Sequence, residues 1–325
     1  MVNTKQAKTI IEQVAVEEIA PGHFRTKWLP GRMGNPLPIA YGGCALGAAT
    51  RAAFETVPDT HHIYSLMGHY HGPASTLQPL VVIVHKTRDT KTFATRRVVL
   101  TQLQADGKTT RTVMEMLIDF HVDEPAALEY SPSTVTKYAG VDEQLTEDDA
   151  GGDPKTTAAA KDMFAMNQQF FESRHCREGV AGQNLHGMLK HTRTTQDERA
   201  ISDKTSAEYT RSKHDLSGSR GDRAAAVSFL LDGALSFLPL THNHMWFDDA
   251  GACSSLDFAL RFMVPDIDLS KEWHLRERTA ISAAHGRTYA EGRLWDAKGQ
   301  LVASMTQASI LRPKPAPKDK SAAKL

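Results

Sequence analysis

The chain has 325 residues, a length that corresponds to about two domains. Its 38 basic and 38 acidic side chains give a formal net charge of 0, which argues against a nucleic-acid binder with a basic surface and against attachment to an anionic membrane by charge. Hydrophobic residues make up 41% and charged residues 23%, enough apolar material for a sizeable core and unlike the composition of a disordered chain.

The N-terminal residues contain no apolar segment of the kind that forms a secretory signal, and no uncharged apolar run is long enough to cross a bilayer. The three cysteines, Cys44, Cys176 and Cys253, are odd in number and far apart, so they fit neither a disulfide framework nor a zinc knuckle. We therefore expect a reducing intracellular setting and no membrane contact.

Residues 1–122 form the first predicted domain. Tyr41 to Cys44 open a run of small apolar residues, Ala45 to Phe54, that predicts a helix with little polar surface, and such a helix must be buried. Alternating apolar residues and two hairpin turns predict an antiparallel sheet after it. The four expected strands are Ile63 to Tyr70, Leu80 to Arg88, Phe93 to Gln102 and Thr109 to Val122.

Residues 123–220 give weaker signals. Glu143 to Asp153 is acidic and glycine-rich, as a solvated loop is, whereas Thr156 to Phe171 could form a helix. Cys176 to Arg220 is polar throughout. We predict a partly disordered linker or insert that connects two domains and contributes to an interface or a lid.

Residues 221–312 resemble the first domain in pattern. A second apolar helix is expected from Ala224 to Leu240, and strands follow it. Ser65-Leu66 falls on Ser255-Leu256 at an offset of 190, and Gly107 falls on Gly299 at an offset of 192. The expected strands of this half are Ser254 to Val264, Trp273 to Ala283, Thr288 to Asp296 and Leu301 to Leu311. The predicted fold is therefore α+β, a double hotdog in which each repeat wraps an antiparallel sheet around one long buried helix.

Asp232 interrupts the apolar run of the second helix. A buried carboxylate is costly unless it is hydrogen-bonded or its pKa rises, and such groups are often functional. The alternative is a structural carboxylate that is capped by backbone N–H groups at a helix end. The sequence alone favours neither the functional nor the structural role. When the two repeats are aligned at an offset of 190, Asp232 falls on Gly42, so only the C-terminal repeat carries the acid.

Two further polar residues accompany Asp232 in the same repeat. Gln307 interrupts a core-like strand, and Ser255 opens the first strand after the helix. An acid can take a proton from water while a hydroxyl and an amide hold that water in line, which is general-base chemistry without a covalent intermediate. Backbone N–H groups at Gly233, and at Gly42 and Gly43 in the other repeat, are the candidates for binding the substrate oxygen.

A metal site is a weaker alternative for the same part of the chain. His69 and His71 form one H-x-H pair, and His242 and His244 form another. Each pair could supply two ligands from one face of a strand, but no cysteine partner or H-E-x-x-H motif accompanies either. We predict no metal.

At these residues the sequence resembles the type II acyl-CoA thioesterases, which include bacterial thioesterase II and peroxisomal acyl-CoA thioesterases and which have a double-hotdog fold. The most specific marker is Arg88-Asp89 followed by Phe93, Thr95 and Arg96-Arg97-Val98. The other markers are Tyr41-Gly42-Gly43, Ser65-Leu66 with Tyr70 and Pro73, Gln102, Leu231-Asp232, Ser255-Leu256-Asp257, and Leu301 to Ser304 with Gln307 and Arg312. The resemblance covers both ends of the chain in the right order and is weak over residues 123–220.

The resemblance implies an acyl-CoA thioesterase that needs neither cofactor nor metal, and its catalytic trio of Asp, Ser or Thr, and Gln carries over to Asp232, Ser255 and Gln307. The chain departs from the family pattern at four places. Phe258 stands where the family has His, and Ala259-Leu260-Arg261-Phe262 stands where an aromatic-rich Met-Trp-Phe follows it. Ala308-Ser309 stands where Glu-Gly follows the Gln, and Cys44 stands where a Gln follows Gly-Gly. These departures retain the trio and bear on the shape of the acyl pocket.

Residues 313–325 form a tail rich in proline and lysine that cannot pack a core. Its last three residues, Ala323-Lys324-Leu325, are a conservative variant of the Ser-Lys-Leu peroxisomal address. We predict import into peroxisomes through the receptor for that address, and a cytoplasmic location otherwise.

Two other functions remain open from the sequence. The first is another hotdog enzyme acting on acyl thioesters, such as a dehydratase, an isomerase or a tailoring thioesterase of one pathway, and the second is a protein that binds acyl-CoA without catalysis. Hotdog modules pair through their sheets, so we also expect double hotdogs to assemble into a homo-oligomer.

Overall fold

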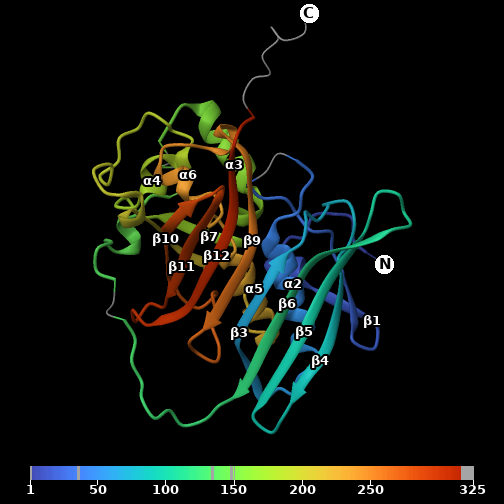
Figure 1. The fold of residues 1–325 in the computed structure, drawn as a ribbon. Helices are drawn as coiled ribbons and strands as arrows, with labels where there is room; N and C mark the ends of the chain where they lie inside the picture. The colour runs from blue at the N-terminus through green and yellow to red at the C-terminus, as the bar shows by residue number, and fades with distance from the viewer. Residues whose placement is uncertain (1, 35–36, 133–134, 147–148, 150, 316–325) are drawn as a thin grey trace, which may run out of the picture.

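The computed structural model describes residues 2–315 except 35–36, 133–134, 147–148 and 150. Their strands form one antiparallel sheet of 12 strands in the order β1-β2-β4-β5-β6-β3-β9-β12-β11-β10-β8-β7. The chain therefore builds the two halves of the sheet one after the other, and β3 and β9 join them (Figure 1). The predicted import tripeptide, Ala323-Lys324-Leu325, lies outside the described residues.

The elements of the N-terminal half are α1 (Ile10–Val14), β1 (Val16–Ala20), β2 (His23–Thr26), α2 (Gly42–Phe54), β3 (His61–Tyr70), β4 (Val81–Asp89), β5 (Phe93–Leu103) and β6 (Thr110–Val122). Those of the C-terminal half are α3 (Pro154–Phe170), β7 (Phe171–His175), α4 (Val180–Gln183), β8 (Thr205–Ser212), α5 (Arg220–Leu231), α6 (Leu238–His242), β9 (Ala250–Phe262), β10 (His274–Ala284), β11 (Arg287–Trp295) and β12 (Leu301–Pro313). Four single 3-10 turns occur among the described residues, at Val141–Glu143, Leu185–Gly187, Ile201–Asp203 and Phe247–Asp249.

The N-terminal half matches the expected helix and four strands to within two or three residues at their ends. Helix α2 is buried along nearly its whole length because its residues are mostly Ala and Gly, which let the sheet approach closely. The sequence pattern missed α1, β1 and β2, each of which has only 4 or 5 residues.

The predicted single helix from Ala224 to Leu240 is wrong. Helix α5 begins at a capping box in which Ser219 and Asp222 bond each other's backbone N–H groups, and it ends at Leu231. The chain then turns, with Ala234 in the left-handed region at φ 69°, before α6 starts with Pro239 in its first turn. Asp232 therefore follows a helix end and does not lie inside a helix.

The region 123–220 also differs from the expected linker. Residues from 154 onward belong to the C-terminal half, because β8 and β7 extend its sheet beyond β10 and α3 leads into β7. The inward-facing residues of β8 are polar, as at Glu208, and a polar strand gives no hydrophobic alternation. Long-range ion pairs satisfy Glu208, so the sequence alone does not signal a strand here.

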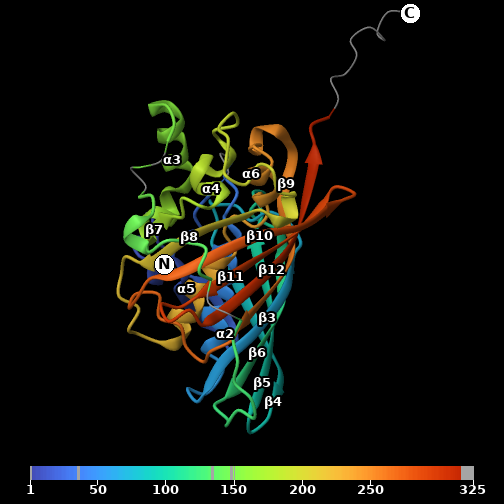
Figure 2. The same ribbon diagram turned by 90° about the vertical axis from the view of Figure 1, so that its left-hand side faces the viewer.

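Helices α2 and α5 lie side by side against the sheet and run antiparallel. The contacts that show this direction are Tyr41 with Phe229, Thr50 with Ser228, and Arg51 with Asp222. The N-terminus of α2 consequently meets the C-terminus of α5. Figure 2 shows α3, α4 and α6 gathered at one end of the molecule, the end at which β12 finishes.

One sheet around two central helices is the double hotdog that the sequence predicts. Among the described residues, no helix is long and apolar enough to cross a membrane.

Candidate active site

The carboxylate of Asp232 is the centre of the site. Asp232 caps the C-terminal end of α5 and is 6% exposed. The hydroxyl of Tyr70, at the end of β3, donates to its Oδ1 at 3.0 Å, and the amide Nε2 of Gln307, on β12, donates to the same oxygen at 2.8 Å. The backbone N–H of Gly43, in the first turn of α2, also donates to the carboxylate. Groups from both halves of the molecule therefore hold one acid.

These donors set the protonation of Asp232. Burial raises the pKa of this carboxyl from 3.8 to about 6, because desolvation disfavours the charged form. The bonds from Tyr70, Gln307 and Gly43, and the charge of Arg276, oppose that rise. Burial and the neighbouring carboxylate also raise the pKa of Tyr70 well above its usual range, so this phenol stays protonated and keeps donating. At neutral pH the site holds an ionised carboxylate with an elevated pKa, which suits a general base.

Gly42 allows the two helix ends to approach. A Cβ atom at this position would lie 2.7 Å from Oδ2 of Asp232 and 2.7 Å from the Tyr70 hydroxyl. The sequence alignment of the two repeats, which placed Asp232 on Gly42, is wrong in register. Gly42 begins α2, whereas Asp232 follows the end of α5. The two residues nevertheless meet in space because the helices run antiparallel.

Ser255 and Gln307 are brought to the same face of the sheet by strand register. In the pairing of β9 with β12, Ala308 pairs with Asp257 and Ser309 pairs with Ser255, so Leu256 is an extra residue in β9. Bulges of this kind re-aim side chains beside active sites. Half-buried Ser255 lies on the wall of the cavity that Asp232 also lines, and the Ser309 hydroxyl lies 3.5 Å from Oε1 of Gln307.

Two adjoining cavities open beside the carboxylate. The smaller, about 120 Å³, is lined by Asp232, Gly42 and Ser255 together with Phe164 and Phe237. The larger, about 430 Å³, extends under the N-terminal half of the sheet. Its lining is mostly apolar, with Ile39, Ala40, Ala45, Leu80, Val113, Met114, Leu256 and Ile310 among its residues. Both cavities share Gly42 and Ser255, so the Asp232 carboxylate and an apolar chamber are neighbours.

The three glycines predicted to bind the substrate oxygen differ in position. The N–H of Gly233 donates to the carbonyl of Leu230, as expected after a helix end, and the guanidinium of Arg276 lies close to it. Gly42 and Gly43 instead form the first turn of α2, directly beside the carboxylate. The N-terminus of a helix carries the positive end of the helix dipole.

Tyr70 is the site residue that the sequence analysis missed as a functional group. The signal that was available is its alternation with Leu66 and Gly68, which places it on the inward face of a strand. A tyrosine hydroxyl on a buried face needs an acceptor, but the sequence does not reveal that the acceptor is Asp232, 162 positions away.

Of the H-x-H histidines, His71 lines the larger cavity, whereas the second pair has partners elsewhere. His242 bonds Ser206 and His244 bonds Asp197, and no group of three or more His, Cys, Asp or Glu side chains is arranged for a metal ion within the described residues.

A buried, hydrogen-bonded carboxylate lies between the two halves of a double hotdog, next to an apolar chamber, and this arrangement is the candidate active site. Residues 29–121 match the acyl-CoA thioesterase N-terminal domain, and residues 153–311 match the acyl-CoA thioesterase C-terminal domain. The chain belongs to the acyl-CoA thioesterase family, and it is a thioester hydrolase that acts on acyl-CoA.

Solved structures share the fold over almost the whole chain. The acyl-CoA thioesterase II TesB2 of Mycobacterium marinum is 19% identical, with a TM-score of 0.68 over 95% of this chain and 99% of that one. A TesB protein of Mycobacterium avium subspecies paratuberculosis is 17% identical, with a TM-score of 0.68 over 94% and 98%. A hotdog protein of unknown function from Alicyclobacillus acidocaldarius is 14% identical, with a TM-score of 0.66 over 95% and 98%.

Proposed function

We propose that this thioesterase hydrolyses acyl-CoA with a water molecule that Asp232 activates directly. The observation that carries the proposal is the carboxylate itself, which is buried, ionised at neutral pH and open to a cavity. Tyr70 and Gln307 both donate to Oδ1, so Oδ2, on the side of Gly42, takes the proton from water. The resulting hydroxide attacks the thioester carbon and the C–S bond breaks. The coenzyme A thiolate takes the proton back from Asp232, so the products are a free carboxylic acid and coenzyme A.

Ser255 and the first turn of α2 complete the machinery in this proposal. The Ser255 hydroxyl lines the same cavity and orients the attacking water together with the amide of Gln307. The N–H of Gly42 faces the developing oxyanion, supported by the dipole of the 13-residue helix α2. Gly43 holds Asp232, and Gly233 serves the turn after α5, so neither acts on the oxyanion.

The acyl chain occupies the larger cavity. This chamber of about 430 Å³ begins at Gly42 and Ser255 and is lined by apolar side chains, so an acyl group that enters it leaves its thioester carbon beside Asp232. Ala45 lies one helical turn after Gly42 and forms part of its wall, and Met114 of β6 forms another part. These two side chains set how much chain fits.

Release of free thiol from a panel of acyl-CoAs tests the mechanism. Wild type should release coenzyme A, with kcat/KM falling below about pH 6 as Asp232 takes up a proton. Asp232→Asn should lose activity about 100-fold to 10,000-fold. The matched control is Asp257→Asn on β9, since Asp257 contributes no bond to the Asp232 carboxylate among the described residues. Full activity of Asp232→Asn would refute the mechanism.

The two alternative functions give different results in the same assay. A dehydratase or isomerase would change the acyl group without releasing thiol. A binding protein would take up acyl-CoA stoichiometrically and release nothing.

Peroxisomal import remains a prediction from Ala323-Lys324-Leu325. Appending the tail 313–325 to a fluorescent protein tests it, because the fusion should collect in peroxisomes, and deletion of the last three residues should leave it in the cytosol.

A further inference from the structure

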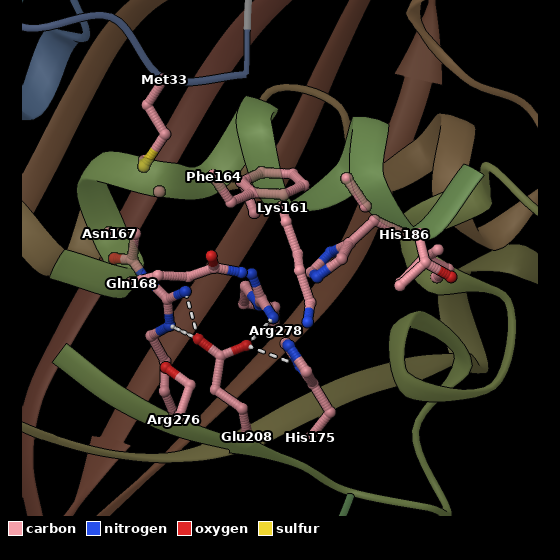
Figure 3. Close-up of a pocket in the computed structure, with 16 residues that line it drawn as sticks. Met33, Lys161, Phe164, Asn167, Gln168, His175, His186, Glu208, Arg276 and Arg278 are labelled. Atoms are coloured by element: carbon pink, nitrogen blue, oxygen red, sulfur yellow. Dashed lines mark hydrogen bonds and ion pairs between the residues drawn. The ribbon is translucent and has the colours of Figure 1, made fainter. Parts of the chain in front are cut away.

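A buried cluster of charges lies behind the active site, around a cavity of about 70 Å³ (Figure 3). Glu208 of β8 lies between Arg276 and Arg278 of β10, and all three are at least nine-tenths buried. Nε of Arg276 donates to Oε1 of Glu208 at 2.9 Å, and Arg278 donates to Oε2. Burial disfavours the ionised form of Glu208, but the two arginines outweigh it and hold the pKa of this carboxyl below its ordinary value. The cluster is therefore charged at neutral pH.

Arg276 connects this cluster to the active site. Besides its bonds to Glu208, its Nη1 donates to the carbonyl of Leu230, in the last turn of α5 and two residues before Asp232. The same nitrogen lies 3.2 Å from where a Cβ of Gly233 would be. One rigid guanidinium thus bridges the sheet and the end of α5, and it lies close beside the turn that carries Asp232.

The buried members of the cluster leave one positive charge in excess. Arg276 and Arg278 carry two positive charges, because the pKa of Arg278 falls only to about 10 on burial. Glu208 carries one negative charge, and burial lowers the pKa of His175 and of His186, which keeps both rings neutral at pH 7. Exposed Lys161, which also lines the cavity, adds to the positive charge. Ionised Asp232 is therefore attracted to the cluster, and the charge of Arg276 lowers its pKa.

We propose that Arg276 is a positioning residue for the hydrolysis: anchored by Glu208, it fixes the carbonyl end of α5 and holds Asp232 in place as an ionised base. This inference rests on the proposed function of Asp232. The other titratable groups facing Asp232 are Tyr41, which precedes α2, Cys44 of α2 and Tyr70 of β3. Those facing Arg276 are Glu208, His175, His186 and Lys161, which line the same cavity.

The variants Arg276→Gln and Arg278→Gln distinguish a loss of Asp232 positioning from a general loss of protein stability. Each removes one buried arginine and leaves Glu208 with the other, so each costs the fold a comparable ion pair. Only Arg276→Gln also releases the Leu230 carbonyl. Arg276→Lys restores the charge but cannot bridge Glu208 and Leu230 at once, because an ammonium is a compact point donor.

The readouts are the pH profile of kcat/KM and the titration of the Asp232 carboxyl by carbon-13 NMR of aspartate-labelled protein, assigned with Asp232→Asn. Arg276→Gln should move both midpoints upward by about one pH unit, the usual effect of losing one close opposite charge. It should also lower kcat about tenfold at high pH, where the carboxylate is ionised but loosely held. Arg276→Lys should return the midpoint to near wild type with kcat still reduced, and Arg278→Gln should shift the midpoint less than Arg276→Gln.

Unchanged midpoints in a folded Arg276→Gln protein would overturn the proposal, as would an equal shift in Arg278→Gln. Where Arg276→Gln does not fold, Arg276→Lys with a wild-type kcat overturns the positioning role. A wild-type protein that releases no thiol from any acyl-CoA refutes the proposed function instead, and the NMR titration still decides whether Arg276 controls Asp232.

Discussion

Replacing Asp232 with Asn should stabilise the protein while abolishing its activity, and the stabilisation should depend on pH. The pKa of this carboxyl is about 6 in the folded protein against an ordinary value of 3.8. The difference of about 2.2 units, at about 1.36 kcal/mol per unit, corresponds to about 3 kcal/mol. This is the free energy that the fold loses when it ionises Asp232 in its buried position.

The sign follows from proton binding. Between pH 3.8 and about 6 the folded protein holds a proton on Asp232 that the unfolded chain has released, so the free energy of unfolding falls as the pH rises through this window. An asparagine side chain at this position does not titrate. The advantage of Asp232→Asn over wild type should therefore grow by about 2 kcal/mol between pH 4.5 and pH 7.5, the part of the total that this range covers.

Urea unfolding of both proteins, followed by tryptophan fluorescence at several pH values, measures this difference. All other titrating groups are the same in both proteins, so their contributions cancel in the difference in unfolding free energy. In the Asp232→Asn variant the new amide would face the Nε2 of Gln307. This contact lowers the free energy of unfolding by an amount that does not depend on pH. A difference in unfolding free energy that stays constant from pH 4.5 to 7.5 would refute the raised pKa and with it the reasoning about the base.

The remaining predictions concern the groups around Asp232. Tyr70→Phe removes one donor to Oδ1 and should move the acid limb of kcat/KM upward by about half to one pH unit in a folded protein, measured as the pH profile; an unmoved limb counts against this role. Gly42→Ala should lower kcat/KM at least about tenfold, since its Cβ would lie 2.7 Å from Asp232 Oδ2; wild-type turnover would contradict the close approach. Ala45→Leu should shift the preference of kcat/KM toward shorter acyl-CoAs and Met114→Ala toward longer ones, and identical preferences in both would remove the acyl chain from this cavity.

Local sequence signals account for most of the fold. The four strands that follow each central helix have alternating apolar residues and short hairpin turns, so their bounds could be predicted closely. The same reasoning fails at β8, where Glu208 faces inward and is satisfied by Arg276, 68 positions away. An ion pair of that sequence separation leaves no periodic signal, and the segment therefore looked like a linker.

The sequence predicts which residues form the site better than it predicts how they are arranged in space. Asp232 and Gln307 are indicated by polar residues in apolar segments, and the structure joins them by a hydrogen bond. The end of α5 at Leu231 could not be predicted, because the apolar run continues past the turn and hides the helix end. Placing Asp232 at a helix end changes which backbone N–H groups it meets, so the roles of Gly42 and Gly233 depend on the structure.

The central claim is that water activated by Asp232 attacks the thioester without a covalent intermediate. A single turnover of acyl-CoA in water enriched in oxygen-18, with enzyme in excess, tests it directly. Attack by water places one heavy oxygen in the released acid and none in the peptide that contains Asp232. Heavy oxygen in Asp232 after the first turnover, with an unlabelled acid, would show that the carboxylate attacks as a nucleophile and would refute its role as a general base.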